Sequence, residues 1–277
     1  MNVLPHSHTF VIPAFGEPQW LERCLVSIRD QTTRSTILVT TSTPNDYVHD
    51  IARRHGVPVI VNHVSEGIAS DWNFAYRQAA SDWVTLAHQD DTYARCYLER
   101  CLSAARRVRN PILVFTAAHE SFGDGRGLAV NVRFKRAIAA AAFAGRASIA
   151  GGVSKRLLLS LGNPVPCPSV MLNKAFLPDF TFPQGWKSNL DWRAWLDLAR
   201  RPGAFVYLRE PLVQRVLHAE AATTRELAAR AEEDGRMFVE LWPWPVAQAL
   251  TAFYARSRHQ YRGLRGDPPS CEGTGAH

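Results

Sequence analysis

Strands and helices alternate along the first 117 residues, and this alternation constrains the fold more than any other feature. Five apolar runs predict strands at residues 8–13, 36–41, 57–61, 83–87 and 112–116. Segments of helical periodicity predict helices at 21–28, 48–52, 67–80 and 94–108. Strands that alternate with helices favour a mostly parallel sheet with helices on both faces, so the α/β class is predicted.

The second half of the chain is less regular. We expect a glycine-containing loop at 119–127, an alanine-rich helix at 133–149 that a Gly-Gly pair ends, a proline-rich turn region at 162–168, a short strand at 170–172, a helix at 188–201 and a strand at 204–208. Residues 225–260 have a mainly helical pattern, and the polar tail from 263 is predicted to be disordered. The predicted parts are therefore an α/β domain at 1–225, a helical extension at 226–262 and the tail at 263–277.

Two adjacent acids, Asp90 and Asp91, follow the fourth predicted strand in the tetrapeptide HQDD. Carboxylates at the mouth of a buried strand are costly without a counter-charge. A divalent cation that bridges to phosphate oxygens commonly supplies that charge. Because open α/β sheets bind ligands at the carboxyl ends of their strands, the pair predicts a metal and phosphate site there. One of the two acids could instead cap the helix that follows.

The overall charge predicts an anionic partner. The net charge is +7 and the pI is about 9.4. The sequence contains no zinc finger, RNA-binding strand motif or helix-turn-helix pattern, so nucleic acid is not the predicted partner. Nucleotide phosphates or an anionic membrane surface would explain the charge equally well.

The remaining composition favours a soluble cytoplasmic protein. The mean hydropathy is -0.17, no apolar run is long enough for a membrane span, and no signal peptide is expected. The five cysteines show no CxxC pairing, which fits a reducing compartment.

Four segments together resemble the family 2 glycosyltransferases, which have the GT-A fold. They are residues 11–17 (VIPAFGE), residues 67–73 (GIASDWN), the Asp90–Asp91 pair and residues 190–192 (LDW). The resemblance covers residues 8–225. It implies a nucleotide-binding half at 8–117, an acceptor half at 118–225, and an inverting hexosyltransferase that works in cell-surface glycan or polysaccharide biosynthesis.

The resemblance also implies which residues form the site. Asp191 corresponds to the catalytic base, and Asp90, Asp91 and His218 correspond to ligands of Mn²⁺ or Mg²⁺. The nucleotide contacts implied are Pro13, Ala14, Phe15, Glu17, Thr40, Thr41, Ser42, Gly67, Asp71, Asn73, Gln89 and Asp90. The expected partners are a nucleoside-diphosphate sugar and a glycan or lipid-linked acceptor. The inner face of an anionic membrane and a second copy of the chain are further candidates.

The chain departs from the family pattern at three places. Thr40, Thr41 and Ser42 stand where relatives carry an Asp pair that reads the nucleotide base, so the identity of the base stays open. Trp72 replaces a customary Arg, and His88 replaces the first acid of the acidic string.

Several residues have structural interpretations beside the functional ones. Asp191 could complement a helix dipole, His218 could be structural, and Asp71 could cap a helix. The aromatic and basic residues of the extension could pack on the core or a second subunit, or could rest on a membrane. A zinc deacetylase, suggested by the string AHQDD, and a sugar-nucleotide-binding protein without turnover are the alternative functions.

Overall fold

The computed structural model describes residues 8–17, 19–122, 130–217 and 227–257. The strands are β1 (His8–Ala14), β2 (Thr36–Thr41), β3 (Val59–Val61), β4 (Trp83–Leu86), β5 (Thr92–Tyr93), β6 (Pro111–Phe122), β7 (Ser148–Ile149), β8 (Val170–Asn173) and β9 (Ala204–Leu217). The helices are α1 (Leu21–Arg29), α2 (Asp46–Arg54), α3 (Ile68–Gln78), α4 (Tyr97–Arg106), α5 (Val130–Phe143), α6 (Gly152–Ser160), α7 (Leu190–Arg200), α9 (Leu227–Leu241) and α10 (Trp244–Ser257), with a 3-10 turn at Cys167–Ser169. His218 and the predicted tail lie outside the described residues.

One sheet organises the described part of the chain, with the strand order β3-β2-β1-β4-β8-β6-β9-β5 and with β7 pairing to β9. β1, β2, β3 and β4 pair in parallel. β8 is antiparallel to both β4 and β6, so β6 runs in the same direction as β4, and β9 is parallel to β6. The carboxyl ends of β1, β2, β4, β6 and β9 therefore point the same way. The predicted α/β fold class, a mostly parallel sheet with helices on both faces, is confirmed.

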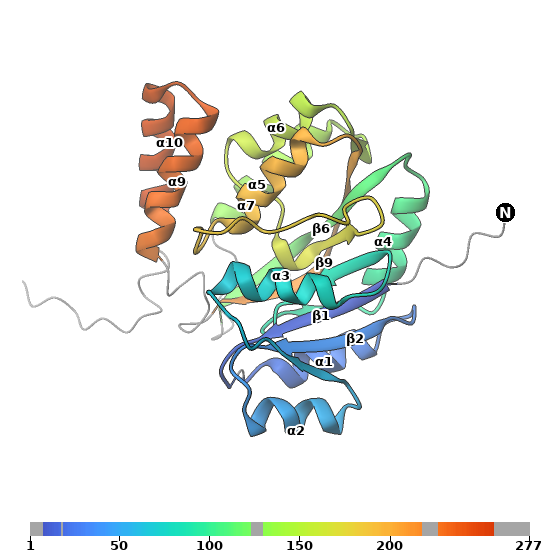
Figure 1. Cartoon of the computed structure of the whole chain (residues 1–277). Helices are drawn as coiled ribbons and strands as arrows, with labels where there is room; N and C mark the ends of the chain where they lie inside the picture. Colours follow the sequence, from blue (N-terminus) through green and yellow to red (C-terminus); the bar gives the residue numbers. More distant parts are fainter. Residues whose placement is uncertain (1–7, 18, 123–129, 218–226, 258–277) are drawn as a thin grey trace, which may run out of the picture.

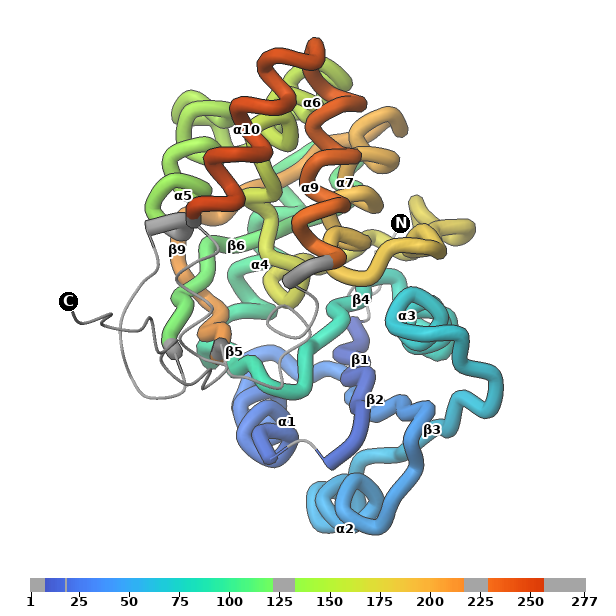
Figure 2. Tube along the Cα trace, turned by 90° about the vertical axis from the view of Figure 1, so that its left-hand side faces the viewer, coloured from blue at the N-terminus to red at the C-terminus, as the bar shows by residue number. Residues whose placement is uncertain are grey.

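The helices cover the two faces of the sheet, and each face has its own core. α1, α2 and α4 contribute to one core, and α3, α5, α6 and α7 contribute to the other. Figures 1 and 2 show α9 and α10 packed side by side beyond α5, α6 and α7, at the same side of the molecule. The helices of the second half of the chain therefore all lie on one face of the sheet.

The C-terminal helices are bound to the domain by aromatic side chains. Phe238 of α9 packs against Trp192 of α7, with 5.3 Å between ring centroids. Trp242 Nε1 donates to the Ser160 carbonyl at 2.8 Å, and Tyr254 Oη donates to the Leu161 carbonyl at 2.8 Å. Burial of a large aromatic side chain contributes about 1.5–3 kcal/mol. The predicted packing of the extension on the core is confirmed for Trp242 and Tyr254, whereas it is wrong for Trp244, whose side chain is 65% exposed.

The structure differs from the sequence prediction in the second half. The loop predicted from residue 119 is wrong for residues 119–122, which continue β6 and pair with β9. The alanine-rich helix ends at Phe143 instead of 149, because Ala144 and Gly145 take positive φ values of 45° and 83°. A further helix, α6, begins at Gly152, where only a break was predicted. Residues 119–122 were predicted as a loop because polar residues interrupt the alternation of apolar and polar side chains from which strands are predicted.

Candidate functional site

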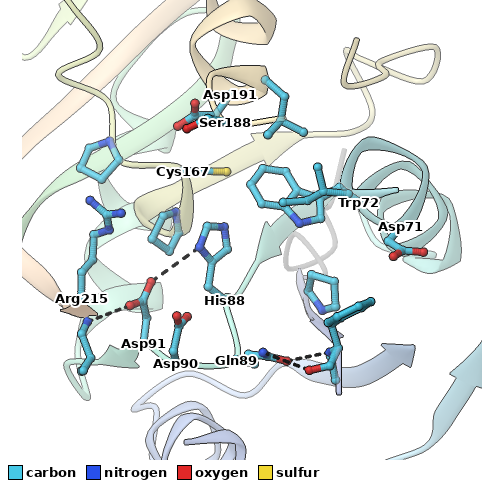
Figure 3. A pocket seen from close by; sticks show the side chains of 18 of the residues that line it. Asp71, Trp72, His88, Gln89, Asp90, Asp91, Cys167, Ser188, Asp191 and Arg215 are labelled. Atoms are coloured by element: carbon cyan, nitrogen blue, oxygen red, sulfur yellow. Dashed lines mark hydrogen bonds and ion pairs between the residues drawn. The ribbon is translucent and has the colours of Figure 1, made fainter. Parts of the chain in front are cut away.

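A cavity of about 880 Å³ opens at the carboxyl ends of the parallel strands. Its lining comes from the loops after β1, β2 and β4, from α3, and from the ends of β6 and β9. The segment before β8, the start of α7, and residues of α5 and α9 complete it. Figure 3 shows Asp191 at one side of this cavity, Asp90 and Asp91 at the other, and Asp71 and Trp72 approaching from α3. Both halves of the predicted domain thus contribute to one site.

Reciprocal hydrogen bonds hold the loops after β1, β2 and β4 together. Gln89 Oε1 accepts from the Phe15 amide at 2.8 Å, and Gln89 Nε2 donates to the Phe15 carbonyl at 3.4 Å. The Gly16 amide donates to Thr43 Oγ1 at 2.7 Å, and Asn45 Nδ2 donates to the Gly16 carbonyl at 2.8 Å. Gly16 has a φ of 67°, a left-handed conformation that favours glycine. The shape of this half of the cavity is therefore fixed by contacts between loops.

Asp71 joins α3 to the loop after β2. Its carboxylate accepts from Ser42 Oγ at 2.8 Å and from Asn62 Nδ2 at 2.8 Å. Gly67, not Asp71, is the N-cap of α3, so the capping interpretation of Asp71 is wrong. A carboxylate thus lies beside Ser42, close to where relatives carry their acidic pair, but it comes from a different element.

The structure places most of the predicted nucleotide contacts on the cavity wall. The residues that line it are Pro13, Ala14, Phe15, Glu17, Thr40, Thr41, Ser42, Gly67, Asp71, Gln89 and Asp90. Phe15 is 51% exposed, which is high for a large apolar side chain. Their roles as nucleotide contacts remain predictions.

Asn73 is the exception among these residues, because its side chain lies away from the cavity wall. Its Nδ2 donates to the Phe182 carbonyl at 2.9 Å, and its Oδ1 accepts from the Phe182 amide at 2.6 Å. The side chain is 6% exposed and does not line the cavity. Both ends of the amide are occupied by backbone, so Asn73 fastens α3 to the chain before α7.

His88, Asp90 and Asp91 form a cluster that could hold a cation. One ligand atom from each residue lies within 4.8 Å of those of the other two. Asp91 is buried and accepts from the Val216 amide at 3.2 Å. Burial, followed by the neighbouring Asp90 carboxylate, raises the pKa of Asp91 well above its usual range. A divalent cation would offset this charge.

The donor set fits Mn²⁺ or Mg²⁺ with help from the imidazole. Burial lowers the pKa of His88 to about 4, so its ring is neutral at pH 7 and has a free lone pair for a metal. Within the part of the chain that the structure describes, His88 Nε2 is buried and has no hydrogen-bond partner. The other ring nitrogen, Nδ1, lies 3.8 Å from Asp91 Oδ2, so it is the atom that could join the two carboxylates on a cation. The sequence prediction omitted His88 from the ligands, although its place in HQDD pointed to it.

Asp191 lies in the first turn of α7, across the cavity from this cluster. Its Oδ1 accepts from the Trp192 amide at 2.7 Å and its Oδ2 accepts from Asn163 Nδ2 at 2.9 Å. Burial raises the pKa of Asp191, whereas the Trp192 amide and nearby cations oppose the rise. A carboxylate that is held at both oxygens and has a raised pKa is suited to accept a proton near neutral pH.

A clamp from α9 holds the start of α7. Glu233, which is 4% exposed, accepts from the backbone amides of Lys187, Ser188 and Asn189 at 2.7, 3.0 and 2.7 Å. Asp234 accepts from Asn189 Nδ2 at 2.7 Å. Donors at the start of a helix are otherwise without partners, and buried ones must be satisfied. The predicted extension is therefore part of the frame that places Asp191, which the sequence prediction missed.

Cationic side chains line the part of the cavity formed by the second half of the chain. Lys135 and Arg136 come from α5, Arg215 comes from β9 and Arg230 comes from α9. Glu120 of β6 forms an ion pair with Arg215. Although burial acts in the opposite direction, the charges of Arg215, Lys135 and Arg230 lower the pKa of Glu120. These basic residues were not predicted as site residues.

The fold and this cavity define a protein of the α/β class that binds its ligand at the carboxyl ends of parallel strands. Residues 9–141 match the model of the family described as "Glycosyl transferase family 2". The predicted resemblance to family 2 glycosyltransferases is thereby confirmed over that segment, which contains the loops after β1, β2 and β4. No curated protein matches the chain.

Solved structures with the same fold support this class. TarS 1-349 of S. aureus has a TM-score of 0.61 and 15% identity, and the match covers 94% of this chain and 74% of that chain. Its complex with UDP-GlcNAc has a TM-score of 0.62 and 12% identity, with 92% and 73% covered. The mannosyltransferase PcManGT of Pyrobaculum calidifontis, in complex with GDP-Man and Mn²⁺, has a TM-score of 0.58 and 14% identity, with 95% and 73% covered. At these identities the likeness establishes the GT-A fold.

No helix in the described residues combines the length and the apolar character needed to cross a membrane.

Proposed function

We propose that this protein is an inverting glycosyltransferase that moves a sugar from a nucleoside-diphosphate donor to an acceptor hydroxyl. The observation that carries the proposal is the placement of two different carboxylate groups in one cavity. The pair Asp90–Asp91 lies at the end of β4, and Asp191 lies across the cavity at the start of α7. The family match and the donor complexes of the structural neighbours support the class of donor.

The donor nucleotide lies in the half formed by the loops after β1, β2 and β4. Phe15 borders the base or ribose, and Asp71 and Ser42 supply polar groups at the end of β2. His88, Asp90 and Asp91 would hold a divalent cation. When bound, such a cation neutralises the charge that develops on the leaving diphosphate.

Asp191 removes the proton from the acceptor hydroxyl. The oxygen then attacks the anomeric carbon from the side opposite the leaving diphosphate, which inverts the configuration. The two hydrogen bonds to Asp191 hold its carboxylate in one orientation, so that little reorganisation is needed during the reaction. Arg215, which acts on both Asp191 and Asp91, adds positive charge between the base and the acidic pair.

The family match supports a glycosyltransferase over the deacetylase alternative. The string that suggested it follows β4, and it lies inside the segment that matches the glycosyltransferase family. The acceptor, whether a glycan or a lipid-linked molecule, the association with an anionic membrane and the formation of a homo-oligomer remain predictions.

Thermal unfolding with UDP and GDP, each with and without Mn²⁺, tests the proposal. A ligand that binds only the folded state raises the melting temperature, and a concentration of 100 Kd stabilises by about 2.7 kcal/mol. We expect at least one nucleotide to stabilise the protein, and to stabilise it more with Mn²⁺. The control is the double variant Asp90→Asn/Asp91→Asn, which should lose the Mn²⁺-dependent part. If neither nucleotide changes the melting temperature with or without the metal, the proposed donor class is wrong.

A further inference from the structure

The basic cluster of Lys135, Arg136, Arg215 and Arg230 has more charge than its acidic neighbours compensate. Three of these cations, Lys135, Arg215 and Arg230, act on both Glu120 and Asp191. Arg215 is paired with Glu120 and also acts on Asp91, which leaves Lys135 and Arg230 beside Asp191, and Arg136 is a further cation on the cavity wall. Buried charges without counter-charges are costly, so this local excess favours an anionic ligand.

Two of the guanidinium groups have hydrogen-bond donors left over. Arg136 Nη2 donates to the Ala118 carbonyl at 2.7 Å, but its Nε is buried without a partner among the described residues. The Nη1 of Arg230 is likewise buried without a partner in the described part of the chain. Unsatisfied buried donors are rare in folded proteins, and these two can donate to the oxygens of an anionic ligand. Guanidinium groups match the geometry of phosphate and carboxylate oxygens.

The electrostatics of Lys135 agree with such a site. Burial, followed by the nearby Arg230 cation, lowers the pKa of Lys135 to about 8. A bound anion would reverse both effects, because it would favour the charged amine.

The position of the cluster separates it from the acidic pair. Arg230 lies one turn before Glu233 and Asp234 on α9, and these two acids bind residues 187–189, directly before Asp191. The free donor of Arg230 therefore lies at the end of the cavity where the acceptor hydroxyl would meet Asp191. The donor diphosphate would lie at the other end, beside Asp90 and Asp91.

We propose that Lys135, Arg136 and Arg230 bind a phosphate-type anionic group of the acceptor, close to the hydroxyl that Asp191 deprotonates. The placement beside the acceptor hydroxyl rests on the proposed function, whereas the anion site itself rests on the cluster alone. Because α9 supplies Arg230, the C-terminal extension takes part in acceptor recognition as well as in holding α7.

Calorimetry with inorganic phosphate tests the anion site. Wild-type protein, Arg230→Gln and Lys135→Gln are each titrated with phosphate, first alone and then in the presence of saturating nucleoside diphosphate and Mn²⁺. We expect the wild type to bind phosphate under both conditions, and each variant to bind roughly tenfold or more weakly. Arg230→Lys should recover part of the affinity, since it keeps the charge and loses the planar fork.

Arg236→Gln is the matched control. Arg236 lies on the same helix, over the ring of Trp186 at 4.4 Å, and does not line the cavity. This variant should bind phosphate as the wild type does, and melting curves of all variants check that they fold.

The titration in the presence of nucleoside diphosphate shows whether the cluster binds a phosphate of the donor or of the acceptor. If nucleoside diphosphate displaces inorganic phosphate, and the Arg230 and Lys135 variants lose nucleotide affinity, the cluster serves the donor and the proposal is overturned. Failure of the wild type to bind phosphate overturns it as well. If no nucleotide binds but phosphate still binds through Arg230 and Lys135, the proposed function fails while the anion site stands.

Discussion

Glu233 offers the sharpest test of how the site is held, because its carboxylate accepts three backbone hydrogen bonds at the start of α7. In Glu233→Gln one carboxylate oxygen becomes an amide NH₂. Its N–H groups then face backbone N–H groups, and donors cannot hydrogen-bond to donors. Hydrogen bonds to a charged group contribute about 1.5–3 kcal/mol each, and the lower cost of burying a neutral side chain offsets part of their loss. We expect a net loss of about 2–4 kcal/mol in the free energy of unfolding. For a chain of this size that lowers the melting temperature by about 4–16 °C.

The same change should displace Asp191. Residues 187–189 lead directly into the first turn of α7, so loosening them moves the carboxylate that begins the helix. A displacement of about 1 Å in a catalytic group can cost about 10²-fold in rate. Turnover should therefore fall by about that factor while nucleotide affinity, measured on the same preparation below its melting temperature, stays unchanged.

Two comparisons make the result decisive. Glu232→Gln changes the exposed neighbour on the same helix and should leave turnover and stability unchanged. In the double variant Glu233→Gln/Asp191→Asn, the loss of turnover should equal that of Asp191→Asn alone, because Glu233 acts through Asp191. Additive losses, or a loss of nucleotide affinity in Glu233→Gln, would refute the idea that Glu233 positions the base.

Four further predictions concern the cavity itself. Asp191→Asn should lower turnover by about 10²- to 10⁴-fold without weakening nucleotide binding, as steady-state kinetics and calorimetry would show. Because folding raises the pKa of Asp191, the stability of the wild type falls as the pH rises from the unfolded pKa of this group to its folded pKa; Asp191→Asn should lose this part of the pH dependence, and an unchanged pH dependence in denaturant titrations would contradict this. Asp90→Asn or Asp91→Asn should remove the Mn²⁺-dependent part of nucleotide affinity, and unchanged metal dependence in calorimetry would exclude both as ligands. Asp71→Asn should change the preference between UDP and GDP by roughly tenfold, because one of its two acceptor oxygens becomes a donating NH₂, and an unchanged ratio of affinities would exclude Asp71 as a reader of the base.

The nucleotide half could be predicted because its signals are local. Each strand from β1 to β4 is a short apolar run, and the polar residues that line the cavity follow these strands directly in the sequence. The periodicity of the apolar side chains predicts whether a segment is a strand or a helix. The end of each predicted strand then predicts which residues lie at the binding edge of the sheet. Asn73 was misplaced because its partner, Phe182, lies 109 residues away and no local pattern records that contact.

The frame around Asp191 could not be predicted for a related reason. In the sequence LAARAEEDGRMFVEL, Glu233 and Asp234 have the spacing of acids on a solvated helix face. Only the packing of α9 shows that they are buried against residues 187–189. The positions of Lys135 and Arg230 could not be predicted either, because a helical cation that faces a cavity and one that faces solvent show the same sequence periodicity. Pairs of charges between distant elements have no sequence signature in a single chain.

The late position of β8 in the chain has a consequence for synthesis. β4 ends at Leu86, but the strand that pairs with its other edge, β8, is not complete until Asn173. At about 5–20 residues per second, the ribosome needs roughly 4–17 s to add the intervening 87 residues. Throughout that interval β4 is an open strand edge, and open apolar edges are sites of aggregation. The nascent first half therefore needs protection from a chaperone or from its own helices until β8 inserts and joins the two halves of the sheet.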